Sequence, residues 1–193
     1  MDRVIVVIPA LNPLPAVVDF VRKLQALPLA GIIVINDGSD KRYNSTFEQL
    51  EQENCIILTH EKNLGKGRSL KTGMEYILKS AERPKGIITV GAHGQHSVLD
   101  VEQVLSSTKI FSDGIILGIR DFKAPEYPFL GKLQNRANSM LFELFIHKRL
   151  LDIQTGLRYI PREHLSWLSK VKGESFNYDT NMLIEAIKRN VPL

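Results

Sequence analysis

The sequence contains a single cysteine, Cys55, among its 193 residues. One thiol excludes an internal disulfide bond, and it excludes zinc sites that are built from several cysteines. Cys55 opens an apolar run at residues 55–58, so we predict that it is a small, buried, hydrophobic side chain. Cysteine chemistry therefore gives no indication of function.

Long hydrophobic runs and a strong charge of one sign are also missing. No apolar run approaches the ~20 residues that a membrane-spanning helix requires, and no leader precedes the first apolar segment, so we expect a cytoplasmic domain. The chain stops after a helical pattern, and we expect a longer protein beyond Leu193. Lys and Arg number 25 against 21 Asp and Glu, a net charge of +4. This excess suits phosphates or an anionic membrane surface but does not indicate nucleic-acid binding.

Five short runs rich in Ile and Val recur in the first 120 residues, at 4–8, 32–35, 56–58, 87–90 and 115–119. They do not alternate with polar residues, which is typical of strands that are buried on both faces of a parallel sheet. Amphipathic helical patterns lie between them at residues 16–27, 67–80 and 98–110, the last after Ser97 as a possible N-cap. This alternation predicts a doubly wound α/β sheet in a single domain.

The pattern changes after residue 120. Residues 121–129 contain prolines and aromatic residues and predict a loop, in which Phe122, Tyr127 and Phe129 pack as a flap or dip toward lipid. A long helix is predicted over 130–151, a loop entering a strand over 152–161, and a last helix over 180–189. We interpret this part as an appended half of the same domain.

Polar segments follow the predicted strands, at residues 9–13, 36–40, 60–67 and 91–96 and at Arg120. In open parallel sheets, ligands bind beyond the carboxyl ends of the strands, where the strand order reverses. Asp37-Gly38 is either a strand-to-helix turn, with Ser39 or Asp40 as the cap, or a site where the Asp37 carboxylate accepts hydrogen bonds from a nucleobase or ribose.

A second glycine-rich segment has two interpretations. Gly65 and Gly67, beside Lys66 and Arg68, bring N–H groups and cations to a phosphate, or they form an ordinary helix start. The segment is not a Walker A motif, and a lone glycine-rich loop is a weak signal. No Gly-x-Gly-x-x-Gly follows the first strand, which argues against a Rossmann dehydrogenase.

Taken together, these segments are more specific than any one alone. Residues 8–13, 34–40, 63–67 with 71–73, and 94–96 resemble, in order and spacing, the motifs of inverting family 2 glycosyltransferases with the GT-A fold. The resemblance is to the branch of dolichyl- or polyprenyl-phosphate sugar synthases, and residues 152–158 and 174–180 look like its distal motifs. It covers essentially the whole chain.

The resemblance implies that a hexose passes from a UDP- or GDP-sugar to a polyprenyl or dolichyl phosphate, with inversion, at the inner face of a membrane. It implies a nucleotide-sugar-binding half at residues 1–120 and an acceptor-side half at 121–193. In the donor half, the resemblance assigns seven residues to the nucleotide-sugar site: Pro9, Ala10, Asn12, Asp37, Lys66, Gly91 and His93. Asp37 would hold the base there.

The resemblance also assigns residues around the phosphates and the acceptor. Arg120, Lys132 and Arg136 would face the diphosphate or the lipid phosphate as catalytic cations, although Lys132 and Arg136 also fit a solvated helix face. Gln154, Thr155 and Arg158 would close the acceptor side. Asp179 would orient the acceptor or a loop.

One family feature is missing from the loop at 91–96. Active members hold Mg²⁺ or Mn²⁺ with two aspartates, and this chain has Gly91 and His93 at those positions. Gln95 retains the third ligand position, and His96 is either a further ligand or a helix-entry residue. Glycine offers no ligand, and imidazole suits Mg²⁺ poorly.

Three hypotheses follow from the missing aspartates. The protein binds nucleotide sugars without catalysis, as a degenerate or regulatory module. Alternatively, it catalyses without metal, with charge supplied by cations drawn from Lys66, Arg68, Arg120, Lys132 and Arg136. The third is Mn²⁺ or Zn²⁺ bound through His93, Gln95 and His96.

Overall fold

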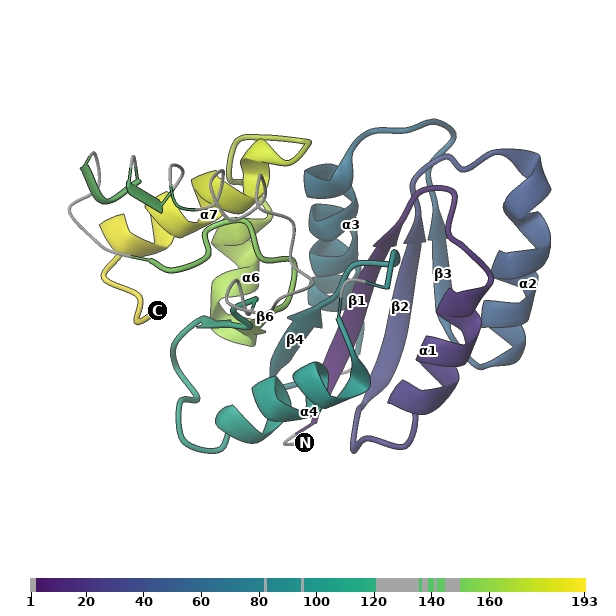
Figure 1. The fold of residues 1–193 in the computed structure, drawn as a ribbon, viewed down its shortest axis with the longest axis horizontal. Helices are drawn as coiled ribbons and strands as arrows, with labels where there is room; N and C mark the ends of the chain where they lie inside the picture. The colour runs from purple at the N-terminus through teal and green to yellow at the C-terminus, as the bar shows by residue number, and fades with distance from the viewer. Residues whose placement is uncertain are drawn as a thin grey trace.

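The computed structural model describes residues 3–81, 83–94, 96–120, 136, 139–140, 142–144 and 150–193. Its described strands form one six-stranded sheet in the order β3-β2-β1-β4-β6-β5 (Figure 1). Their bounds are β1 Val4–Ala10, β2 Gly31–Asn36, β3 Ile56–Thr59, β4 Gly86–Thr89, β5 Ile116–Leu117 and β6 Arg158–Pro161. The first four are parallel to one another, and β6 runs antiparallel between β4 and β5.

Helices cover both faces of this sheet. One face carries α1 (Ala16–Leu24), α2 (Asn44–Gln52) and α4 (Val98–Ser107), and a 3₁₀ turn, η1 (Lys41–Tyr43), precedes α2. The other face carries α3 (Lys66–Lys79), α6 (Arg162–Leu168) and α7 (Asn177–Lys188). Successive β1 side chains point to opposite faces: Val4 and Val6 enter the first core cluster, and Ile5 enters the second. The predicted single α/β domain with a mostly parallel sheet is confirmed.

The five predicted strands are all present, with two differences. Full burial on both faces holds for β1, β2 and β4, but it is wrong for β3, whose residues are half-buried or exposed because β3 lies at the sheet edge. The fifth strand is shorter than the run at 115–119, because β5 pairs only with β6 and lies at the opposite edge. Cys55 is buried, as predicted.

The predicted helices begin close to their expected starts. Ser97 caps α4 as predicted, because its Oγ accepts from Asp100 N–H at 3.2 Å while Asp100 Oδ2 accepts from Ser97 N–H. Helix α2 was not predicted, because it buries only Thr46, Phe47 and Leu50 in a polar segment. Helix α6, only seven residues long, was also missed.

The second half joins the same sheet. Residues 136, 139–140 and 142–144 are helical, which agrees with part of the helix predicted over 130–151, and Phe142 packs with Ile153 and Leu183. The loop predicted at 121–129 lies outside the described residues. Strand β6 and helix α7 confirm the strand and last helix that the sequence predicted. None of the helices in the described ranges combines the length and apolar character needed to cross a bilayer.

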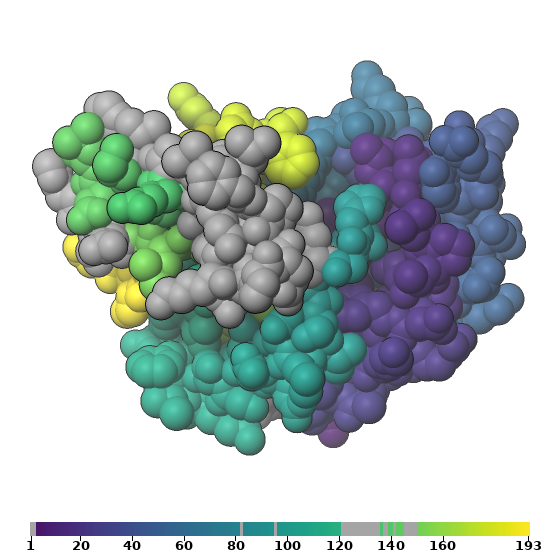
Figure 2. Space-filling view, viewed as in Figure 1, coloured from purple at the N-terminus to yellow at the C-terminus, as the bar shows by residue number. Residues whose placement is uncertain are grey.

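The strand order reverses between β1 and β4, since β2 and β3 continue to one side of β1 and β4 lies on the other. The loops that leave β1, β2 and β3 gather at one end of the sheet (Figure 1). In the space-filling view, the teal atoms of the β4–α4 region border the purple atoms of the first part of the chain (Figure 2). A switch point of this kind is where open α/β sheets bind ligands.

Gly38 joins two of these loops and gives a stability prediction. It has φ +69°, and a β-carbon there would lie 2.2 Å from the main-chain carbon of Lys62. We expect Gly38→Ala to lower the free energy of unfolding by about 3 kcal/mol, through left-handed strain plus displacement of the Lys62 backbone. Urea unfolding measures this.

Gly94→Ala is the matched control. Gly94 also has φ +69°, but no described atom lies within 4 Å of its β-carbon position. It should lose only about 1 kcal/mol, from backbone strain alone. Equal losses in the two variants would show that the contact with Lys62 contributes nothing.

Candidate active site

Hydrogen bonds from Asn12 hold the β1 and β2 loops together. Asn12 N–H donates to Ser39 Oγ, and Asp40 N–H donates to Asn12 Oδ1, each at 2.9 Å. Asn12 itself has φ +51°, a conformation that asparagine tolerates better than most residues. Of the other residues predicted for the nucleoside pocket, Pro9 is half-buried and Ala10 is buried at the end of β1. The structure therefore brings these residues to the switch point. The described hydrogen bonds of Asn12, however, connect the loops after β1 and β2.

The carboxylate of Asp37 is buried and receives three protein donors. Its Oδ1 accepts from His60 Nδ1 at 2.7 Å and from Leu64 N–H at 2.9 Å, and Oδ2 accepts from Gly65 N–H at 2.9 Å. These bonds fix the β2 loop against the start of α3. The alternative of a strand-to-helix turn is also observed, because Asp40 Oδ1 accepts from Arg42 N–H at the start of η1. Contact between Asp37 and a nucleobase stays a prediction.

His60 is a site residue that the sequence analysis did not single out. Its Nδ1 must donate to the Asp37 carboxylate, and its Nε2 lies 3.0 Å from Thr72 Oγ1. Thr72 Oγ1 also accepts from Arg68 Nε at 3.3 Å, so its own proton is available for His60 Nε2. This chain of hydrogen bonds positions Asp37 through His60. A histidine directly after β3, in the same loop set as Asp37, was the signal for it.

The glycines at the start of α3 allow residues 174–178 to pack closely against this helix. A β-carbon on Gly65 would lie 2.4 Å from the carbonyl oxygen of Glu174, and one on Gly67 would lie 2.5 Å from Cβ of Tyr178. Arg68 N–H donates to the same Glu174 carbonyl at 2.9 Å. The hypothesis that Gly65 brings its N–H to a phosphate is wrong in this structure, because that N–H donates to Asp37.

An ion cluster joins α3, α7 and β6. Lys66 Nζ lies 2.5 Å from Asp179 Oδ2, and Arg158 Nη1 lies 3.5 Å from Asp179 Oδ1. Asp179 is buried, and the Lys66 side chain is 21% exposed. The structure thus brings together Lys66, predicted on the donor side, and Asp179, predicted on the acceptor side.

Arg158 is buried, and its guanidinium donates hydrogen bonds to main-chain carbonyl groups. Nε donates to the carbonyl of Thr155, Nη1 to that of Asp179 and Nη2 to that of Ile153, all near 3 Å. Burial is the largest influence on its pKa and lowers it, while Asp179 raises it. Arg158 therefore supports the loops, and the prediction that it faces an acceptor directly does not agree with this arrangement.

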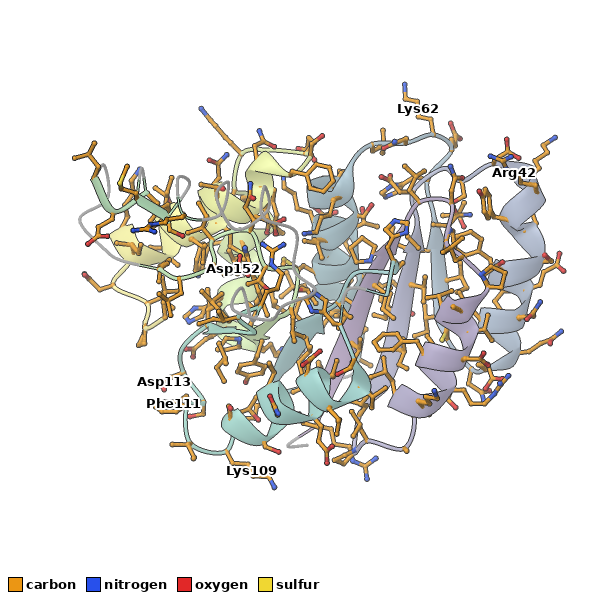
Figure 3. All side chains as sticks on the ribbon, in the orientation of Figure 1. Arg42, Lys62, Lys109, Phe111, Asp113 and Asp152 are labelled. Atoms are coloured by element: carbon orange, nitrogen blue, oxygen red, sulfur yellow. The ribbon has the colours of Figure 1, made fainter. Side chains whose placement is uncertain are left out.

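Arg120 forms a second ion pair. Its Nε donates to Asp152 Oδ2 at 2.7 Å, and its Nη2 donates to Asp152 Oδ1 at 2.8 Å. Asp152 is fully buried and lies within the body of the protein, whereas Lys62 points outward at the end of the sheet (Figure 3). Gln154 is exposed, and Thr155 is buried with its hydroxyl donating to the carbonyl of Gly118. The direct phosphate role predicted for Arg120 remains a prediction.

The loop after β4 presents few ligands. Gly91 is half-buried and His93 is exposed, while His96 is buried. Within the described ranges, His96 Nε2 has no hydrogen-bond partner. Burial has the largest effect on the pKa of His96 and lowers it. The carboxylate of Asp100 opposes this effect, whereas the positive charges of Arg120 and Lys66 lower the pKa further.

The described residues do not fit the divalent cation that the resemblance implies. No group of three His, Cys, Asp or Glu side chains among them could hold a metal ion. Gly91 has no side-chain ligand, and the described acids of the site already bind protein donors. Gln95 and Lys132 lie outside the described residues, and Arg136 is helical and exposed.

Two open grooves lie away from this end of the sheet. One, of about 640 Å³, is lined by Pro84, Lys85, Pro161 and Arg162, which lie where β4 begins and β6 ends. The other, of about 500 Å³, lies between α6 and α7. Neither groove is lined by the polar loops that follow β1, β2 and β4.

Comparisons with known proteins identify the family of this chain. The sequence profile described as "Glycosyl transferase family 2" matches residues 5–179. The chain is 28% identical over 196 residues to an uncharacterised protein of Methanocaldococcus jannaschii, covering 100% of this chain and 79% of that protein. It is 26% identical over 210 residues to the UDP-N-acetylglucosamine--dolichyl-phosphate N-acetylglucosaminyltransferase of Methanococcus voltae, covering 98% and 82%.

Solved structures share the fold. Glucosyl-3-phosphoglycerate synthase from Mycobacterium tuberculosis, in complex with phosphoglyceric acid, superposes with a TM-score of 0.72 at 17% identity. The same enzyme with Mg²⁺ and uridine diphosphate gives a TM-score of 0.64 at 18% identity. Each comparison covers 97% of this chain and 66% of the solved chain, so the chain spans just under two thirds of the length of these structures.

The profile match extends over most of the chain, and the polar loops converge on the switch point of a GT-A fold. The protein therefore belongs to glycosyltransferase family 2.

Proposed function

We propose that this glycosyltransferase passes a sugar from a nucleoside-diphosphate donor, UDP- or GDP-linked, to a polyprenyl or dolichyl phosphate. The Methanococcus voltae relative, named as acting on dolichyl phosphate, supports this acceptor class. The uridine diphosphate in one similar solved structure supports a nucleotide donor. An acceptor of this kind would bring the protein to the inner surface of a membrane.

One observation carries the choice of a phosphate acceptor. Each buried carboxylate of the described site already binds protein donors: Asp37 binds His60, Asp152 binds Arg120, and Asp179 binds Lys66. Among the described residues, no buried carboxylate is left to act as a general base. A phosphate oxygen is ionised near neutral pH and needs no base, whereas an alcohol does.

The proposed reaction is an in-line displacement with inversion. An oxygen of the acceptor phosphate forms a bond to the anomeric carbon while the bond from that carbon to the donor diphosphate breaks. The nucleoside diphosphate leaves with the bonding electrons. Lys66, at the start of α3, offsets part of the charge that develops on the leaving group. Its side chain is only 21% exposed, so solvent screens its charge less than that of a surface lysine.

The two-half organisation, donor side at 1–120 and acceptor side at 121–193, is part of this proposal. Arg120 ends the first half and pairs with Asp152 of the second, so the reacting groups would meet between them. Lys132 and Arg136 would add cations on the acceptor side.

The missing aspartates favour a second candidate: a module that binds nucleotide sugar without transferring it. Gly91 and His93 replace the family's metal ligands, and the described residues offer no substitute set. We therefore derive no catalytic step through a metal. Turnover separates the two candidates.

The first test compares two acceptors of equal chain length, a short prenyl phosphate and the corresponding prenol. With UDP- and GDP-sugars as donors, we expect transfer to the phosphate to be roughly 100-fold faster or more, because the alcohol lacks a general base. Radiolabelled product formation measures both rates. Equal rates with both acceptors would contradict the phosphate assignment, and no turnover with either would favour the binding module.

The second test restores the metal ligands with the double variant Gly91→Asp and His93→Asp. We expect its affinity for UDP or GDP to rise about tenfold or more on adding Mn²⁺, because two carboxylates then supply hard oxygen ligands. Wild-type affinity should be nearly the same with Mn²⁺ and with a chelator. Calorimetry measures these affinities.

Gly91→Asn with His93→Asn is the matched control, since asparagine has the same size without the charge. It should gain little from Mn²⁺. If the aspartate pair also gains nothing, our alignment of this loop with the family's metal motif is wrong.

A further inference from the structure

We propose that the space beside Gly156 binds a phosphoryl oxygen, held by Nε2 of His96 and Nζ of Lys66. The inference rests on the proposed function, because it names side chains that meet a phosphate of the donor or the acceptor. It gives His96 a substrate-binding role, distinct from the helix-entry and metal-ligand alternatives considered from the sequence.

The first observation is the state of His96. Only 8% of the residue is exposed, and Nε2 has no hydrogen-bond partner in the described part of the chain. Burying a polar atom without a partner costs about 1–3 kcal/mol, so native proteins rarely do it without a reason. A ligand oxygen at Nε2 removes that cost, since a neutral imidazole can donate from this nitrogen.

The second observation is the space that Nε2 faces. A β-carbon on Gly156 would lie 3.6 Å from His96 Nε2 and 3.6 Å from Lys66 Nζ, and apart from its two chain neighbours no other described residue comes within 4 Å of that point. Both nitrogens therefore lie around the same point, at ordinary van der Waals distance from it. A phosphate group, whose oxygens point in several directions, can bind two donors placed around one point.

The charges of the surrounding cluster favour an anion. Lys66 and Arg158 share the single carboxylate of Asp179, and Arg120 pairs with Asp152. The carboxylate of Asp100 also acts on His96. The Lys66 ammonium has three N–H donors, and the bond to Asp179 uses one. A bound anion would give Lys66 a second negative partner in a place where solvent screens charges poorly.

The main chain at Gly156 is itself held in place by a hydrogen bond. Its carbonyl oxygen accepts from Thr89 Oγ1 at 2.8 Å, which ties the segment before β6 to the end of β4. A side chain at this position would fill the space between the two nitrogens. The proposed site therefore requires a residue without a side chain at position 156.

Two variants test the site by calorimetry in a chelator, with pyrophosphate, UDP, GDP and a short prenyl phosphate as probes. His96→Leu removes the donor, and Gly156→Ala fills the space with a methyl group that meets both nitrogens at ordinary contact distance. We expect each to weaken binding roughly 10- to 100-fold, the cost of losing a hydrogen bond to a charged group. Gly31→Ala, with no described atom within 4 Å of its β-carbon position, should bind like the wild type.

The probes distinguish the source of the phosphate. A loss with UDP or GDP places the donor diphosphate here, and a loss confined to prenyl phosphate places the acceptor here. Urea unfolding verifies that each variant folds. On the wild-type protein, long-range ¹H–¹⁵N NMR follows His96 Nε2 directly, and its resonance should shift when the tightest-binding probe is added.

Unchanged affinities in the folded variants, or an unmoved His96 resonance at saturation, would overturn the inference. If the wild type transfers sugar and the variants bind as tightly, only this inference fails. If pyrophosphate binding depends on His96 and Gly156 but no sugar is transferred, the inference stands and the proposed function fails. A wild type that binds none of the probes overturns both.

Discussion

Burial of the Asp179 carboxylate between Lys66 and Arg158 is the interaction on which the site depends. It connects the start of α3, the start of α7 and the start of β6, three elements far apart in the sequence. Removing one partner of a buried pair costs about 3–5 kcal/mol, because the remaining charge is left without compensation. The same contact sets Lys66 beside Gly156 and His96. Packing of α7 against α3 therefore also fixes the position of Lys66 among the loops at the carboxyl ends of the strands.

The missing aspartates change how charge is balanced at this site. A family member with a divalent cation places two positive charges beside the diphosphate. This chain instead offers protein cations, three of which are already paired with Asp179 and Asp152. Such pairs are preorganised, so little rearrangement is needed when an anion arrives. Within this cluster, Lys66 and Arg158 share the single carboxylate of Asp179, an arrangement that suits a phosphate better than a neutral ligand.

Much of the fold could be predicted from the sequence, because unbroken Ile- and Val-rich runs require burial on two faces. The pattern did not reveal the antiparallel placement of β6 between β4 and β5, since strand order depends on long-range packing. For the site, the motifs identified Asp37, Lys66 and Asp179, but not that Lys66 pairs with Asp179 or that Arg158 binds main-chain carbonyls. His60 had a sequence signal, its place directly after β3, but its bond to Asp37 and the unpartnered nitrogen of His96 become visible only when the loops are folded together.

A crystal structure of the protein with bound UDP or GDP, whichever binds more tightly, grown in a chelator, tests the central claim most directly. The account predicts the nucleotide at the carboxyl ends of β1 and β4, with its diphosphate beside Lys66 and without a metal ion. A nucleotide in the groove between α6 and α7, or in the one lined by Lys85 and Arg162, would contradict it. So would a diphosphate at the switch point that touches none of the buried cations.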